Sequence, residues 1–294
     1  MNNKTRCFAL ALLCAIIAVS SASAVKVSAD TGPKPSVTVC VNDIPEGGKV
    51  YVTLLSKNNM SGPYRADGKY YKEEEVDLTD KAFAEYKDAD GFYYLYNYRK
   101  VTANDNRFRW GYYPPTTFKI LIYSEKDNSF LVSGVLERYA FSSYYTVGLK
   151  EGSFSQNGEL LAENSYDYVG ETCRLIARIL FTLLVEVGIA YAFGYRKKSF
   201  AVILAANLVT QIGLNVALNL INYSSGFLAF LLWYIALELL VVIVESVFYM
   251  IAVPKIDKDC PVKLKKFWVL LLYSLAANVA SFAAGVLIFW GIGI

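Results

Sequence analysis

The C-terminal part of the chain is a succession of long apolar segments separated by short polar loops. The segments cover residues 172–193, 200–221, 227–253 and 267–291. Each reaches the roughly 20 apolar residues that a helix needs to cross a bilayer. The pattern therefore predicts a four-transmembrane-helix bundle over residues 169–294.

A stripe of amide side chains interrupts the second apolar segment. Asn207, Gln211, Asn215 and Asn219 follow one another at intervals of four residues, so they share one face of a helix. Amides in hydrocarbon must find hydrogen-bond partners. We therefore expect this face to look into a helix bundle or a wet cavity.

The other three segments supply polar groups at a similar depth. At 1.5 Å per residue, about ten residues from a segment end correspond to roughly 15 Å, half of a hydrocarbon core about 30 Å thick. That count brings polar residues of all four segments to the middle of the bilayer. The resulting prediction is an intramembrane polar cluster of Glu186, Gln211, Asn215, Glu238, Glu245 and Asn278.

Two interpretations of this cluster remain open. A charged residue at mid-bilayer costs on the order of 3 kcal/mol, so the glutamates must be paired, protonated or hydrated. Arg178 is too far along its helix to reach Glu186, and we expect it at the outer interface or paired with the acidic stretch 163–171. Either Glu186 and Glu238 form a proton- or hard-cation-binding site with the amides, or protonated glutamates and amides hold the helices together.

Residues 25–168 form a polar segment in which short strands are the better interpretation. Val37, Val39 and Val41 alternate with polar residues, a second strand covers 50–55, and 118–122 with 130–135 look like a hairpin. An amphipathic helix near 80–87 and an aromatic strand at 92–98 lie between them. The predicted fold class is an α+β membrane protein, with an antiparallel β-sandwich-like ectodomain before the helix bundle.

Aromatic residues are frequent in this segment, and their role has two interpretations. Trp110, Tyr112 and Tyr113 precede Pro114-Pro115, which fixes an extended backbone. We expect an exposed aromatic site there for an extracellular carbohydrate or protein ligand. The alternative is that most aromatics in this segment build the core of the sandwich and shield its edges.

The N-terminus has the pattern of a secretory signal. Lys4 and Arg6 precede the apolar run 7–19, and Ala24 ends a small-residue cleavage motif. A second cut is available after Ala29, and an uncleaved segment would be one more anchor. Basic residues at 195–199 and 254–266 place those loops in the cytoplasm. The expected location is the plasma membrane of a cell envelope, with an extracytoplasmic N-terminal domain at 25–168.

Composition excludes several kinds of chemistry. The 294 residues contain no histidine, which removes Ser-His-Asp triads, Cys-His dyads and His-ligated zinc. Five cysteines form no CxxC motif; a Cys40–Cys173 disulfide is one option and lone buried thiols are the other. A net charge of +3 without a basic tract argues against nucleic acid. We expect no enzyme, cofactor or metal centre.

Two functions fit these expectations. The first is a secreted binding or sensing domain held on the lipid bilayer by the helices. The second is a proton- or cation-coupled transport component that uses the midplane glutamates, for which a homo-oligomer would have to enclose the pathway.

The chain also resembles a group of bacterial membrane proteins that have no assigned activity. The matching residues in the helices include Glu186, Phe193-Gly194-Tyr195-Arg196, Asn207, Thr210-Gln211, Asn215, Tyr234, Glu238, Glu245 and Tyr249, and those in the ectodomain are 110–115 and 137–141. The resemblance implies a signal peptide, an extracytoplasmic β domain and four helices. It implies nothing about chemistry.

Overall fold

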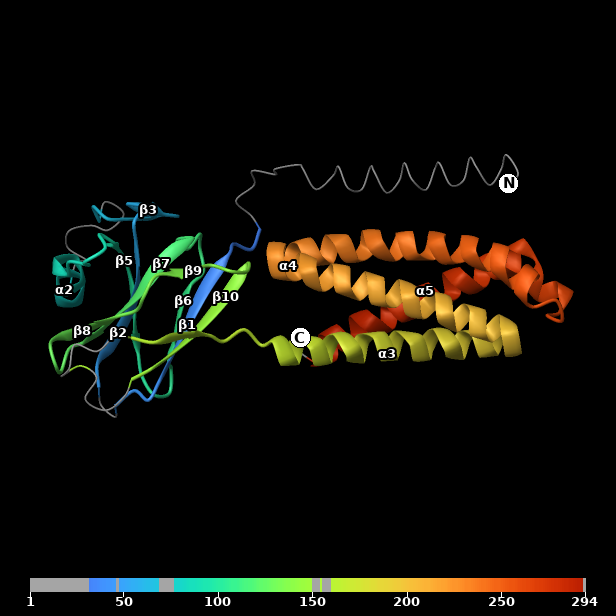
Figure 1. The fold of residues 1–294 in the computed structure, drawn as a ribbon, viewed down its shortest axis with the longest axis horizontal. Helices are drawn as coiled ribbons and strands as arrows, with labels where there is room; N and C mark the ends of the chain where they lie inside the picture. Colours follow the sequence, from blue (N-terminus) through green and yellow to red (C-terminus); the bar gives the residue numbers. More distant parts are fainter. Residues whose placement is uncertain (1–31, 46–47, 69–76, 150–153, 155–159, 293–294) are drawn as a thin grey trace. The chain divides into compact units, whose positions relative to one another are not determined.

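The computed structural model describes residues 32–45, 48–68, 77–149, 154 and 160–292, with the backbone alone for 284–292 (Figure 1). A β-rich region comes first and helices follow it. The predicted signal peptide at 1–24 and both cleavage sites lie outside the described residues.

The β-rich region contains two main sheets. One has the order β11-β10-β1-β6 and the other β5-β2-β7-β8, with β9 also paired to β7. The strands of the first sheet are β1 (Ser36–Asn42), β6 (Arg107–Trp110), β10 (Ser142–Gly148) and β11 (Ala162–Asn164). Those of the second are β2 (Val50–Ser56), β5 (Tyr93–Val101), β7 (Thr117–Ser124), β8 (Ser129–Val132) and β9 (Leu136–Glu137). A small hairpin joins β3 (Met60–Ser61) to β4 (Tyr64–Arg65).

The inward faces of the two sheets share one hydrophobic core. Val37, Val39 and Val41 of β1 are fully buried with Phe118 and Ile120 of β7. Strict alternation along both strands directs every second side chain inward, as the sequence indicates. The predicted hairpin is present because β7 pairs antiparallel with β8, although β8 ends at Val132.

One strand pairing departs from the antiparallel prediction. β1 pairs in parallel with β10, with Ser36 opposite Ser142, while β6 pairs antiparallel with the other edge of β1.

A short helix, α2 (Leu78–Glu85), lies between β4 and β5 in the chain and begins at the N-cap Asp77. The Asp77 carboxylate accepts hydrogen bonds from the N–H groups of Thr79 and Asp80 at 2.8 and 2.9 Å.

The exposed position expected for Trp110 is wrong. Trp110 is 1% exposed and belongs to the sandwich core, where its ring meets Tyr64 edge to face at 4.9 Å between centroids. Its indole N–H donates to the Tyr112 carbonyl oxygen at 3.2 Å. In β6 every second residue turns inward, so Phe108 and Trp110 are buried together.

Four helical segments follow the β-rich region. They are α3 (Tyr168–Phe193), the two parts of α4 (Lys197–Ile256), which are separated by non-helical backbone at Gly226, and α5 (Phe267–Ile292) after the short 3₁₀ helix η3 (Val262–Lys265). By length and composition, α3 and α4 are apolar enough to cross a membrane, and Phe267–Ala283 is a shorter apolar stretch.

Glycine is required at the break in α4. Gly226 has φ 81° and ψ −179°, a conformation that residues with a side chain rarely adopt. A Cβ atom there would also clash with the ring of Phe141. The backbone N–H of Phe141 donates to the Tyr223 carbonyl oxygen at 2.8 Å, so the loop before β10 contacts the turn between the two parts of α4.

The cysteines that the structure describes are all free thiols. Cys40 is partly buried, Cys173 is exposed and Cys260 is buried. No Cys40–Cys173 disulfide forms, and only Cys260 fits the expectation of a buried thiol.

Candidate functional site

All six residues of the predicted polar cluster are buried. The four helical segments each contribute: Glu186 comes from α3, Gln211 and Asn215 from the first part of α4, Glu238 and Glu245 from its second part, and Asn278 from α5. The amide stripe of α4 is turned toward the inside of the helices, whereas the most exposed residues of the same helix are leucine, isoleucine and valine. The spacing in the sequence therefore identified the correct face.

Hydrogen bonds join the cluster into two groups. In the first, the Gln211 side-chain N–H donates to Glu186 Oε1 at 3.1 Å, and the Asn215 side chain donates to the Gln211 backbone carbonyl at 2.9 Å. In the second, Glu245 accepts from the Thr210 hydroxyl at 2.5 Å and from the Asn278 amide at 2.8 Å. Thr210 is thus a member of the hydrogen-bonded cluster that the predicted set of six residues did not include.

Several acceptors in this cluster have no hydrogen-bond partner among the described residues. They are Glu186 Oε2, Glu238 Oε2 and Asn278 Oδ1. Glu186 interacts electrostatically with both Glu245 and Glu238, and no ion pair to any of the three carboxylates occurs in the described chain. Three negative charges in one buried site would repel one another. With no ion pair among the described residues, protonation or hydration are the ways to offset this repulsion.

Within the described residues, no group of three or more His, Cys, Asp or Glu side chains is arranged to hold a metal ion. Carboxylates with adjacent amides can share protons instead, which needs no convergent ligand set.

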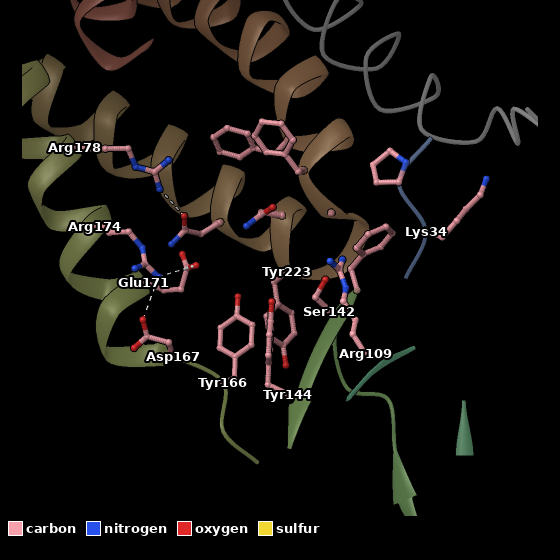
Figure 2. Close-up of a pocket in the computed structure, with 17 residues that line it drawn as sticks. Lys34, Arg109, Ser142, Tyr144, Tyr166, Asp167, Glu171, Arg174, Arg178 and Tyr223 are labelled. Carbon is pink, nitrogen blue, oxygen red and sulfur yellow. Dashed lines mark hydrogen bonds and ion pairs between the residues drawn. The ribbon is translucent and has the colours of Figure 1, made fainter. Parts of the chain in front are cut away.

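A second feature is a pocket of about 440 Å³ inside the compact unit formed by residues 33–294 (Figure 2). Its wall comes from the start of α3, from both sides of the break in α4 and from strands β6 and β10. The basic side chains that line it are Lys34, Arg109, Arg174 and Arg178, and the acidic ones are Asp167 and Glu171. Four basic and two acidic groups leave a net charge of +2 on the wall.

The α3 side of the pocket presents two arginines one turn apart. Figure 2 shows Arg174 and Arg178 reaching from α3 toward the interior. Arg174 contacts Asp167 at 3.3 Å and Glu171 at 3.1 Å, and Arg178 donates to the side-chain oxygen of Asn219 at 2.7 Å. Arg174, not Arg178, therefore pairs with the acidic stretch 163–171, through the N-cap Asp167 and through Glu171 in the first turn of α3. Arg178 instead contacts Asn219 at the end of the amide stripe.

The β-rich region supplies the opposite wall. Arg109 lies between the buried residues Phe108 and Trp110, so strand alternation turns it outward. No ion pair to Arg109 occurs within the described residues. In Figure 2, Arg109 and Ser142 lie on the other side of the tyrosines from α3.

Aromatic rings separate these two walls. Tyr166 packs against Tyr223 with ring centroids 5.3 Å apart and against Tyr144 at 6.1 Å. Burial raises the pKa of Tyr166, so its hydroxyl stays neutral and able to donate a hydrogen bond. The pocket thus combines positive charge, neutral donors and flat apolar surface.

The predicted aromatic site lies beside this pocket and does not line it. Tyr113 is 45% exposed, Tyr112 is half-buried, and their rings meet edge to face. The Lys34 ammonium lies 5.3 Å from the centre of the Tyr113 ring. Of the three predicted residues, only the two tyrosines are available to a ligand.

Sequence reasoning missed the pocket because its residues are far apart in the chain. Arg178 was visible as a cation in an apolar segment, but nothing in the sequence near it indicated Arg109 or Tyr223. A comparison with known protein families finds no match, and a comparison with curated proteins finds none either.

Proposed function

We propose that the chain is an integral membrane protein of the cell envelope whose extracytoplasmic β domain binds or senses a ligand without catalysing a reaction. In this proposal α3, the two parts of α4 and α5 form a four-helix transmembrane bundle. The loops at 195–199 and 254–266 are cytoplasmic, and the break at Gly226 lies on the outer side with the β domain.

Apolar exposure on the helices supports a membrane location. Large aliphatic side chains project outward from several helices, among them Leu184, Val209, Leu232 and Leu272, and each is more than half exposed. Polar side chains lie inside instead, as in the cluster around Glu186 and Gln211. This inverted arrangement suits helices surrounded by lipid and would be costly in water.

The observation that carries the binding function is the pocket at the Gly226 end. It draws its wall from the β domain and from the helices, so a ligand bound there touches both. A hydrogen bond from Phe141 to Tyr223 also links the two. A ligand that contacts two elements stabilises one arrangement of them, which is how binding is converted into a signal.

The test is a thermal unfolding screen of the purified full-length protein against small anions, lipids and saccharides. A ligand that binds only the folded state raises its stability by mass action. We expect at least one compound to raise Tm in the native protein and to lose this effect in Arg109→Gln. The matched control Arg107→Gln removes the same charge two residues away, outside the pocket, and should respond like the native protein. A shift that survives in Arg109→Gln would refute binding in this pocket.

A second candidate function is proton-coupled transport, favoured by the unpartnered carboxylate oxygens of Glu186 and Glu238. Four helices enclose little space, so a pathway would require a homo-oligomer. In vesicles with an imposed proton gradient, Glu238→Gln should abolish flux while the protein stays folded. Flux equal to that of the native protein would exclude this function.

A further inference from the structure

The donor pattern of the pocket is more specific than a positive charge. The guanidinium groups of Arg174 and Arg178 each keep a buried Nε–H that has no hydrogen-bond partner among the described residues. Buried donors without partners are costly, so a ligand with several acceptor oxygens would be favoured there. Arginine offers a planar fork of donors that matches the oxygens of carboxylate or phosphate groups.

The existing partners of these arginines distinguish between those two anions. Two carboxylates, Asp167 and Glu171, already engage Arg174 on one side. A further anion that contacts both Arg174 and Arg178 must present oxygens in more than one direction. A tetrahedral phosphate does so, whereas the two oxygens of a carboxylate lie in a single plane.

The position of the pocket along α3 places apolar side chains beside the arginines. Arg178 is ten residues into α3, which corresponds to roughly 15 Å along the helix from Tyr168. Phe227 and Phe230 line the pocket near this level, and the Arg178 guanidinium lies 5.8 Å from the centre of the Phe230 ring. In the proposed topology this level is the boundary between headgroups and hydrocarbon in the outer leaflet.

We propose that the pocket is a phosphate site, in which Arg174 and Arg178 bind the phosphate of a lipid headgroup or of a soluble phosphate ester and Arg109 adds positive charge from the opposite wall. The tyrosines Tyr144, Tyr166 and Tyr223 contact the group esterified to the phosphate. This inference rests on the proposed binding function and names its ligand class.

The experiment uses the full-length protein in an uncharged detergent and measures binding by calorimetric titration and by the shift in Tm. The probes are dioctanoyl phosphatidylglycerol, glycerol phosphate and inorganic phosphate, with dioctanoylglycerol as a phosphate-free control and octanoate as a carboxylate control. Losing a charge-assisted hydrogen bond weakens binding by about 10- to 100-fold. We expect this loss for the phosphate probes in Arg178→Gln, and a smaller weakening in Arg109→Gln, which removes positive charge from the opposite wall.

Two controls keep the result interpretable. Arg107→Gln removes an exposed charge from the same strand as Arg109 and should leave affinity unchanged. Because Arg178 also holds Asn219, its variant can lose stability for structural reasons. Arg109 makes no ion pair within the described residues, so Arg109→Gln tests the effect of the pocket's positive charge separately.

The outcomes distinguish a lipid phosphate from a soluble phosphate ester. They also distinguish failure of the phosphate class from failure of the proposed binding function. Binding of phosphatidylglycerol alone identifies a lipid headgroup, whereas equal binding of glycerol phosphate identifies a soluble ester, and both support a phosphate site. Octanoate binding that Arg178→Gln removes, with no phosphate probe bound, overturns the phosphate class but leaves a binding function. Phosphate binding that persists in both arginine variants overturns this site. Failure of every probe, with no response in the wider ligand screen, overturns both.

Discussion

Two glutamates on one face of α4 should respond in opposite ways to the same substitution. Glu245 accepts hydrogen bonds from Thr210 at 2.5 Å and from Asn278 at 2.8 Å, one on each carboxylate oxygen. Glu238, two turns away, has an oxygen with no partner among the described residues. Replacing a carboxylate by an amide keeps the shape but leaves one acceptor oxygen where there were two.

The magnitudes follow from these contacts. In Glu245→Gln one of the two donors faces an NH₂ group, and a buried donor without a partner costs about 1–3 kcal/mol. At roughly 2–4 °C per kcal/mol for a chain of this size, Tm should fall by about 2–12 °C. In Glu238→Gln the Tyr234 side chain can still donate to the remaining acceptor oxygen, and a buried carboxylate is removed from the cluster, so Tm should stay constant or rise.

The assay is thermal unfolding of both full-length variants in the same detergent at neutral pH. Each variant is the matched control of the other, because the substitution, the helix and the face are identical. If the two variants shift Tm equally, or if Glu238→Gln is the more damaging, the assignment of a satisfied and an unsatisfied carboxylate is wrong.

Three further outcomes are expected. Trp110→Ala should destabilise the protein by about 3–5 kcal/mol because it empties a core position, whereas Tyr113→Ala should change stability by less than about 1 kcal/mol; equal effects in chemical denaturation would contradict the burial of Trp110. The Ser199 hydroxyl donates to Asp257 and lowers the pKa of that carboxyl. The stabilisation from this hydrogen bond should therefore be present above pH ~3.9 and be lost as the pH falls through the lowered pKa. If Tm depends on pH in the same way in Asp257→Asn, Asp257 is not the group responsible. Gly226→Ala should lower Tm because it strains the backbone by about 1–3 kcal/mol and meets the Phe141 ring, and an unchanged Tm would show that the break in α4 does not require glycine.

The spacing of apolar and polar residues predicted which face of a strand or helix is buried, because that face depends only on neighbouring residues. Alternation at Val37, Val39 and Val41 identified a strand with one buried face, and intervals of four residues identified the face of α4 that carries Gln211. In both cases the side-chain period of the backbone alone decides which residues are turned toward the core. That information is local, so a single sequence contains it.

Pairing between distant segments was not predictable in the same way. The parallel alignment of β1 with β10 joins Ser36 to Ser142, and no local pattern selects that partner. Trp110 was predicted to be exposed from the prolines that follow it, although its alternation with Arg107 and Arg109 already indicated an inward side chain. The pocket depends on such long-range contacts, since Arg109 and Arg178, which both line it, are far apart in the sequence.

Ligand binding from outside the cell requires the β domain and the Gly226 end of α4 to be on the extracytoplasmic side. The direct measurement is labelling of single cysteines, in a background without the native ones, by a membrane-impermeant maleimide on intact cells. Lys126→Cys in the loop between β7 and β8 should be labelled at once, and Asp259→Cys between α4 and η3 only after the membrane is permeabilised. Labelling of Asp259→Cys on intact cells, or protection of Lys126→Cys, would contradict the proposed topology and the ligand site that depends on it.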